Sequence, residues 1–252
     1  MAIKKALVLA DIHCPEEDKK ALASVEKYMA TEKFDYVIYL GDFMDLSLIS
    51  HHNKDKLRKV EGKRILKEYE AGNKILDRHQ KLIYAHNPKC VFYFLYGNHS
   101  DRISKYIDAN PQLEGMIEVD KGLRFKERGF KEIKCYPDGE VLKINDLIFT
   151  HGSFTSGNVA KKHLEAYNSS VVFGHLHSPS MYTGVSFDKN NIKSGYGLGC
   201  LARYSQEYLG KAPSKWKKSF GVVYFPDKKH HQVYFVDIGE HGFISPEGKL
   251  YK

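Results

Sequence analysis

The sequence predicts an α/β fold in which two β-sheets pack against each other with helices on the outside. Short apolar runs alternate with helical patterns over the first two-thirds of the 252 residues, and short strands separated by turns fill the rest. Strand–helix–strand alternation is typical of a parallel sheet that binds ligands at the carboxyl ends of its strands. The chain shows no internal repeat, low-complexity tract or Pro/Gly-rich linker, so residues 1–252 are expected to form a single domain.

Hydrophobic periodicity predicts the elements of the first part. Apolar runs of strand length, rich in β-branched or aromatic residues, lie at Ala6–Ala10, Tyr36–Leu40 and Val91–Tyr96. Helices are expected between them, over Lys19–Met29 and Gly62–Ala85, where apolar residues recur at helical spacing.

The last third is expected to add strands that form a second sheet packed against the first. Turn signals stand at Pro137-Asp138-Gly139 and at Asn145-Asp146. The predicted strands are Leu147–Thr150, Val171–Phe173, Lys193–Leu198, Phe220–Phe225 and Gln232–Val236.

The amino-acid composition indicates which binding partners and which cellular compartment to expect. The 39 Lys and Arg exceed the 31 Asp and Glu, for a net charge of +8, which favours an anionic partner such as nucleic acid; the alternative is a merely basic protein. Four cysteines stand far apart in the sequence, which suits a reducing cytosol, so we expect a cytoplasmic protein. The apolar run near the N-terminus is too short to span a membrane, and no membrane partner is expected.

Polar residues able to bind metal follow apolar strands at five places. One such residue is commonly a helix cap or turn former, but five clusters together supply two Asp, one Asn and four His as candidate ligands. The clusters are Asp11-Ile12-His13, Gly41-Asp42-Phe43-Met44-Asp45, Gly97-Asn98-His99, His151-Gly152 and Gly174-His175-Leu176-His177.

This donor set indicates hydrolytic metal chemistry. Oxygen and imidazole ligands without thiolate suit Mn²⁺, Fe, Co²⁺, Ni²⁺ or Zn²⁺ and argue against a structural zinc site built from cysteines. Asp42 is suited to bridging, because the two oxygens of one carboxylate can bind two cations, and a pair of cations can clamp a phosphate. The glycines beside the candidates, at positions 41, 97, 152 and 174, permit close approach of the backbone.

In this order the five motifs resemble those of the calcineurin-like metallophosphoesterases. The motifs D-x-H, G-D-x-x-D, G-N-H, H-G and G-H-x-H fall between residues 7 and 177. The resemblance implies a two-sheet β-sandwich flanked by helices, and phosphoester hydrolysis with two divalent metal ions. Mn²⁺ is the favoured ion, with Fe, Ni, Co, Zn or Mg as alternatives.

The resemblance also implies a role for each residue. His99 would lie outside the metal ligands and protonate the leaving oxygen or stabilise the charge on the phosphate. Asp45 would orient a ligand through a hydrogen bond. The implied metal ligands are Asp11, His13 and His177 for the first ion, Asn98, His151 and His175 for the second, and Asp42 as the bridge.

The sequence departs from the protein phosphatases of this superfamily. Leu46-Ser47 replaces their Arg-Gly pair, and Ser100-Asp101 stands where they have Glu after the third motif. Asp101 is therefore the nearest candidate to orient His99, with Ser100 as an alternative. Arg102 could grip a phosphate oxygen or pair with an acid on its own helix. The stretch from Gly97 onward is similar to phosphoesterases of phage and bacterial type, in which an amphipathic helix follows the motif.

Three functions are consistent with these residues. The favoured one is a phosphodiesterase or nuclease acting on nucleic acid or nucleotides, because of the basic charge and the missing protein-phosphatase signatures. The second is a phosphomonoesterase acting on nucleotides, nucleic-acid ends or phosphoproteins. The third is a non-catalytic phosphate-binding module, against which the intact ligand set argues.

One basic stretch near the C-terminus contains the single tryptophan. Trp216 is surrounded by Lys211, Lys215, Lys217 and Lys218, a pattern that can neutralise phosphates and stack on a base. The alternative is a solvated loop whose tryptophan caps the second sheet. His51 and His52 are expected in the loop after the second motif, where substrate could reach them; the favoured interpretation is a solvated pair of side chains.

Overall fold

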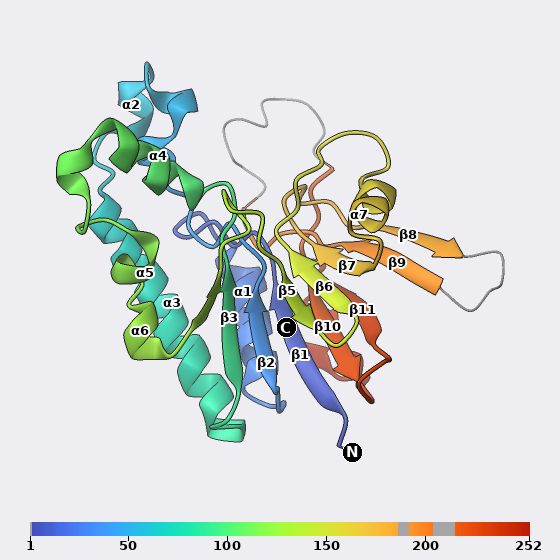
Figure 1. Ribbon diagram of the computed structural model, residues 1–252. Coiled ribbons are helices and arrows are strands. Elements are labelled where there is room, and N and C mark those ends of the chain that lie inside the picture. The colour runs from blue at the N-terminus through green and yellow to red at the C-terminus, as the bar shows by residue number, and fades with distance from the viewer. Residues whose placement is uncertain (1, 186–191, 204–214) are drawn as a thin grey trace.

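The computed structural model describes residues 2–185, 192–203 and 215–252, and it confirms the predicted fold class. Two main sheets lie side by side in Figure 1, with helices on their outer faces. The six-stranded sheet has the order β11 (Gln232–Asp237), β10 (Ser219–Phe225), β1 (Lys4–Leu9), β2 (Tyr36–Tyr39), β3 (Val91–Leu95) and β4 (Lys131–Ile133). The five-stranded sheet has the order β5 (Leu142–Ile144), β6 (Leu147–Thr150), β7 (Ser170–Phe173), β9 (Ile192–Gly197) and β8 (Ser180–Val185).

Helices connect and cover these strands. The α-helices are α1 (Lys19–Met29), α2 (Leu57–Val60), α3 (Ile65–His86), α4 (Asp101–Ala109), α5 (Val119–Gly122), α6 (Phe125–Arg128) and α7 (Val159–Tyr167). The described residues also form short 3₁₀ turns at η1 (Ser47–Ile49), η2 (His51–Asn53) and η3 (Pro111–Leu113), and a small hairpin pairs β12 (Phe243–Ile244) with β13 (Leu250–Tyr251). Within the described part of the chain, no helix combines the length and apolarity needed to cross a membrane.

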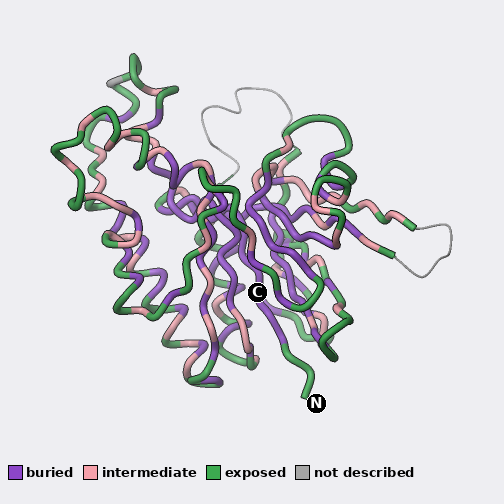
Figure 2. Tube along the Cα trace, viewed as in Figure 1, coloured by how far each residue is buried: buried purple, intermediate pink, exposed green. Residues whose placement is uncertain are grey.

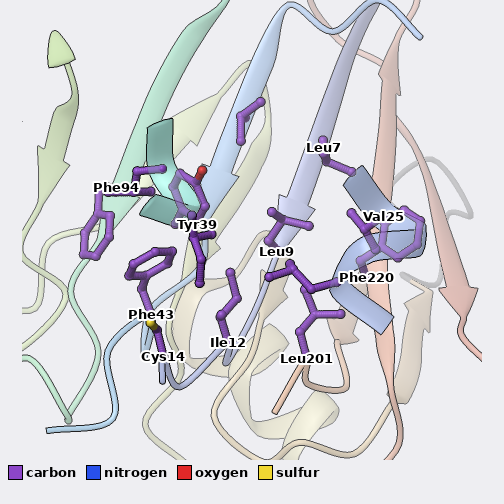
Figure 3. Packing of buried hydrophobic residues seen from close by; sticks show 14 of the residues in the cluster. Leu7, Leu9, Ile12, Cys14, Val25, Tyr39, Phe43, Phe94, Leu201 and Phe220 are labelled. Carbon is purple, nitrogen blue, oxygen red and sulfur yellow. The ribbon is translucent and has the colours of Figure 1, made fainter. Parts of the chain in front are cut away.

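Alternation along β1 explains how the layers pack. Successive side chains of a strand point to opposite faces, so Leu7 and Leu9 belong to the cluster that includes α1 and α3, whereas Ala6 and Val8 belong to the cluster between the sheets. Figure 3 shows Leu7 and Leu9 in one buried layer with Val25 of α1. Because both faces of β1 are covered, its apolar run is continuous, as is typical of strands in the interior of such folds.

The structure corrects one expectation about the last third of the chain. The predicted strands at 220–225 and 232–236 exist as β10 and β11, but they extend the first sheet instead of joining the second. β10 pairs antiparallel with β1, from Lys4 opposite Phe225 to Val8 opposite Gly221. This pairing buries β10 and protects the edge of β1, a contact between distant segments that local periodicity does not report.

The predicted long helix also begins later than expected. Gly62 has a φ of +75°, which is incompatible with an α-helix, so residues 57–60 form the separate turn α2 and α3 starts at Ile65. Strand β8 was not predicted, because its residues alternate between exposed and half-buried at the edge of the second sheet.

Candidate metal centre

The structure gathers all seven predicted metal ligands at one edge of the two sheets. Strands β1, β2 and β3 are mutually parallel, as are β6 and β7, so the loops after them emerge together. These loops carry Asp11, His13, Asp42, Asn98, His151, His175 and His177.

The backbone of these loops is strained where the candidates stand. Left-handed backbone is costly for residues with a Cβ, by about 1–2 kcal/mol each, and it concentrates at functional sites. Five of the seven candidates adopt it, with positive φ values at Asp11 (53°), His13 (53°), Asp42 (44°), His175 (73°) and His177 (58°). The surrounding strands therefore hold the loops in conformations that aim these side chains inward.

A first group of donors contains Asp11, His13 and His177. Nε2 of His177 lies 3.1 Å from Oδ1 of Asp11 and 3.1 Å from Nε2 of His13. All three side chains are buried, and their donor atoms lie close enough together to hold one metal ion.

A second group contains Asp42, His151 and His175, with Asn98 beside them. Nε2 of His151 lies 3.3 Å from Oδ2 of Asp42, 3.3 Å from Nδ1 of His175 and 3.0 Å from Oδ1 of Asn98. Nδ1 of His151 lies 3.0 Å from the carbonyl oxygen of Leu40, to which it donates. Nε2 of His151 therefore faces a carboxylate oxygen, an amide oxygen and a second imidazole, a set of donors that a cation can bind together.

Asp42 connects the two groups. Its Oδ2 lies 3.3 Å from Nε2 of His151 in the second group and 4.0 Å from Nε2 of His13 in the first. Its Oδ1 accepts a hydrogen bond of 2.8 Å from the backbone N–H of His99, which fixes the rotation of the carboxylate.

Glycines beside the candidate ligands leave no room for a Cβ. A Cβ on Gly97 would overlap Oδ1 and the backbone nitrogen of Asp42, and a Cβ on Gly174 would come within 2.5 Å of Oδ2 of Asp11. The expectation that glycines permit close approach beside the ligands is met at these two positions and at Gly41, whose Cβ would come within 2.2 Å of Nδ1 of His151.

With the geometry of the two donor groups described, this chain can be compared with known proteins. A family model for calcineurin-like phosphoesterase matches residues 4–179. The chain belongs to the calcineurin-like phosphoesterase family. Members of this family bind divalent metals, and the donor set of this chain, buried and free of thiolate, fits that chemistry.

Solved structures that resemble this chain are distant in sequence. Wild-type Vps29 from Entamoeba histolytica complexed with Zn²⁺ is 13% identical, with 95% of each chain covered and a TM-score of 0.46. Vps29 from Cryptosporidium parvum is 12% identical, with 96% of this chain and 95% of that one covered and a TM-score of 0.45. The Pseudomonas putida nuclease MPE is 14% identical, with 91% and 86% covered and a TM-score of 0.40. A search of curated proteins finds no match.

Charge interactions with neighbouring side chains set the pKa values of Asp42 and His151 in the candidate centre. Burial alone raises the pKa of Asp42, but the imidazoles of His151 and His99 outweigh it and hold that pKa well below its usual range. In turn, burial lowers the pKa of His151, whereas Asp42 raises it, to a net value of about 9. The site therefore favours positive charge among its carboxylates, which is the electrostatic condition for binding cations.

His99 stands next to the two groups. Its Nε2 lies 3.7 Å from Oδ2 of Asp42, and its Nδ1 donates to the carbonyl oxygen of Asp45 at 2.7 Å. The guanidinium of Arg102 donates two hydrogen bonds here, one to Nε2 of His99 at 2.8 Å and one to the carbonyl oxygen of Asp45 at 2.7 Å. Burial lowers the pKa of His99 to about 3 although Asp42 opposes the shift.

The group that orients His99 differs from the one expected. The carboxylate of Asp101 pairs with Lys105 at 2.5 Å, and the hydrogen bond to Nδ1 of His99 comes from the backbone carbonyl of Asp45. Backbone carbonyls are present at every residue, so no sequence signal marks this partner. Arg102, for which two roles stood open, contacts His99 directly.

Two further residues at the site were not assigned by the sequence. The ring of Trp216 packs edge to face on His177 with centroids 4.0 Å apart, so this tryptophan lies at the candidate metal centre. Lys211, which the basic stretch also included, lies outside the described residues.

Glu68, in the first turn of α3, is buried and accepts a hydrogen bond of 3.0 Å from the backbone nitrogen of Leu46. The sequence did not predict this contact, because a glutamate in an amphipathic helix is ordinarily expected to face solvent.

Proposed function

We propose that this chain is a phosphodiesterase that depends on two divalent metal ions and cleaves nucleic acid or nucleotides. The observation that carries the proposal is the position of Asp42, whose Oδ2 faces His13, His151 and His99 within 4.0 Å. A carboxylate shared by two donor groups, with an imidazole outside both, matches the arrangement of a two-metal hydrolase.

Each donor group would hold one ion, with Asp42 shared between them. Divalent metals bound there supply Lewis acidity toward a phosphoester and a strong nucleophile at neutral pH. We favour Mn²⁺, because imidazole and carboxylate donors both suit it. The first ion would be held by Asp11, His13 and His177, and the second by Asn98, His151 and His175.

His99 and Arg102 would act on the phosphate itself. Because the carbonyl of Asp45 holds Nδ1 of His99, its Nε2 is the atom left to face the phosphate. Once this nitrogen is protonated, it can pass its proton to the leaving oxygen or stabilise the charge there. The guanidinium of Arg102 reaches the same nitrogen, so it stands where it can donate to a phosphate oxygen. Phosphate binding would then replace a contact that Arg102 now makes to His99.

Support for a nucleic-acid or nucleotide substrate comes from the charge of the chain. The net charge of +8 favours polyanions, and Leu46-Ser47 stands where protein phosphatases carry Arg-Gly. A phosphomonoesterase is the second candidate, because the same ligands can bind a terminal phosphate.

The test compares a diester with a monoester. Metal-free protein supplied with Mn²⁺ is expected to hydrolyse bis-p-nitrophenyl phosphate faster than p-nitrophenyl phosphate. Asp42→Asn is expected to abolish turnover, and His99→Ala to lower kcat by about 10²–10⁴-fold with Mn²⁺ affinity retained. His230→Ala, on an exposed hairpin, is the matched control.

Three outcomes decide among the candidate functions. Diester turnover lost in both site variants supports the phosphodiesterase. Turnover of the monoester alone transfers the proposal to a phosphomonoesterase. Tight Mn²⁺ binding without turnover of either ester, across several metals and oligonucleotide substrates, contradicts hydrolysis and leaves a phosphate-binding module.

A further inference from the structure

The segment between the second motif and α3 concentrates the positive charge of the chain. Residues 54–67 contain seven Lys or Arg and two acids, a net charge of +5 within fourteen residues, compared with +8 for the whole chain. This segment, called the basic arm below, includes α2 and the first residues of α3.

The basic arm is attached to the candidate metal centre from both sides. The chain leaves the centre at Leu46, directly after Asp45, and Glu68, the residue that follows the arm, accepts a hydrogen bond from the backbone nitrogen of Leu46 at 3.0 Å. Lys63 donates to Oγ of Ser47 at 2.6 Å and lies 3.7 Å from Glu16, in the loop that follows His13. Figure 1 shows α2 projecting beyond α4 on the side of the molecule where the parallel strands end. The charge therefore extends outward from the centre.

The cations at the tip of the arm face solvent. Lys54, Lys56 and Arg58 are exposed, and no carboxylate in the described ranges forms an ion pair with any of them. Figure 2 colours most of the tube at this tip as exposed residues. Lysines and arginines that lack acidic partners and project from one point are the electrostatic footprint of a polyanion.

We propose that the basic arm binds the phosphate backbone of a nucleic acid strand and leads that strand to the metal centre. The inference rests on the proposed phosphodiesterase and refines its substrate to a polymer. A mononucleotide occupies only the ligands and His99, and charges that project away from the centre contribute little to holding it. A strand several nucleotides long meets both the centre and the arm, and each phosphate neutralised on the arm releases counterions.

The test measures binding without metal, so it does not depend on catalysis. A fluorescein-labelled single-stranded oligonucleotide is titrated with protein in EDTA, and anisotropy is followed at several salt concentrations. The triple variant Lys54→Ala/Lys56→Ala/Arg58→Ala is expected to weaken binding by at least about tenfold at low salt. The slope of log Kd against log salt is expected to fall by about 2.

A second triple variant controls for the loss of charge. Lys33→Ala/Lys89→Ala/Lys228→Ala removes three exposed cations at the opposite ends of the strands and is expected to bind as the wild type does. Thermal unfolding of both variants shows whether they fold. A duplex of the same sequence identifies the preferred form of nucleic acid.

Several results would overturn the arm as the binding surface. They are equal weakening in the two triple variants, no oligonucleotide binding by the wild type, or binding of polyglutamate as tight as that of the oligonucleotide. Failure of the wild type to hydrolyse bis-p-nitrophenyl phosphate, with arm-dependent binding intact, refutes the proposed activity alone.

Discussion

Oδ1 of Asp45 lies 3.3 Å from Nδ1 of His13, while the backbone carbonyl of the same residue accepts a hydrogen bond from Nδ1 of His99. One residue thus orients two imidazoles that would otherwise rotate, one in the first donor group and one outside it. The carboxylate is buried, and His13 holds its pKa well below the usual range despite burial. Asp45 therefore remains a charged acceptor for Nδ1–H of His13.

Removing this carboxylate is expected to weaken metal binding. Partners that orient a metal-binding histidine typically contribute 10–100-fold in affinity, so Asp45→Ala should raise the Kd for Mn²⁺ by about that factor. Asp45→Asn should cost less, because its amide oxygen can still accept from His13. Isothermal titration calorimetry provides the measurement, with Asp35→Asn at the opposite ends of the strands as control. Unchanged affinity in Asp45→Ala would show that His13 needs no such partner.

Trp216 offers a direct signal of metal binding. It is the single tryptophan of the chain, and the centroid of its ring lies 4.0 Å from the centroid of the His177 ring. Binding of paramagnetic Mn²⁺ at the first donor group is expected to quench its fluorescence in a saturable titration. His177→Ala should abolish the response, and His86→Ala on the exposed end of α3 should preserve it. A titration that reaches full hydrolytic activity without any change in fluorescence would remove His177 from the ligands.

Gly97→Ala is expected to damage the centre through crowding. Its Cβ would overlap Asp42, so the carboxylate must move, and we expect Mn²⁺ affinity to fall at least about tenfold together with a loss of stability. Gly139→Ala is the informative control, because its Cβ meets no atom within 4 Å although its φ is +73°. It should cost only about 1–2 kcal/mol of stability and leave metal affinity intact. Comparable metal affinity in the two variants would contradict the argument.

Glu68 predicts a specific pH dependence of stability. Burial, with Asp45 nearby, raises its pKa from 4.5 to about 7. The folded state therefore holds a proton that the unfolded state releases, so this contribution is present below about pH 4.5 and is lost as the pH rises to about 7.

Glu68→Gln mimics the protonated acid and should remove this dependence. Relative to the wild type, the variant should gain about 3 kcal/mol in unfolding free energy between about pH 5 and about pH 8. Urea unfolding of metal-free protein at the two pH values measures the difference, with exposed Glu165→Gln as control. A difference that does not vary with pH would show that Glu68 is ionised in the folded state throughout.

Most of the candidate site could be predicted from local sequence. Asp11, Asp42 and His151 each follow an apolar strand, and a polar residue at the end of a buried run is a signal confined to a few neighbouring residues. The ends of parallel strands meet at one edge, so the clusters could be expected to converge before any distance was known. Helix α1, predicted with its observed bounds, is likewise set by its own periodicity and by the capping side chain of Asp18.

The family, the two-sheet fold class and the set of side chains at the strand ends follow from short sequence patterns, because each depends on a few neighbouring residues. Contacts between segments that lie far apart in sequence become visible only in the folded molecule. The pairing of β10 with β1, the carbonyl of Asp45 behind His99 and the packing of Trp216 on His177 depend on how distant segments pack. A backbone carbonyl or a ring face is available at many positions, and packing alone selects the one that is used.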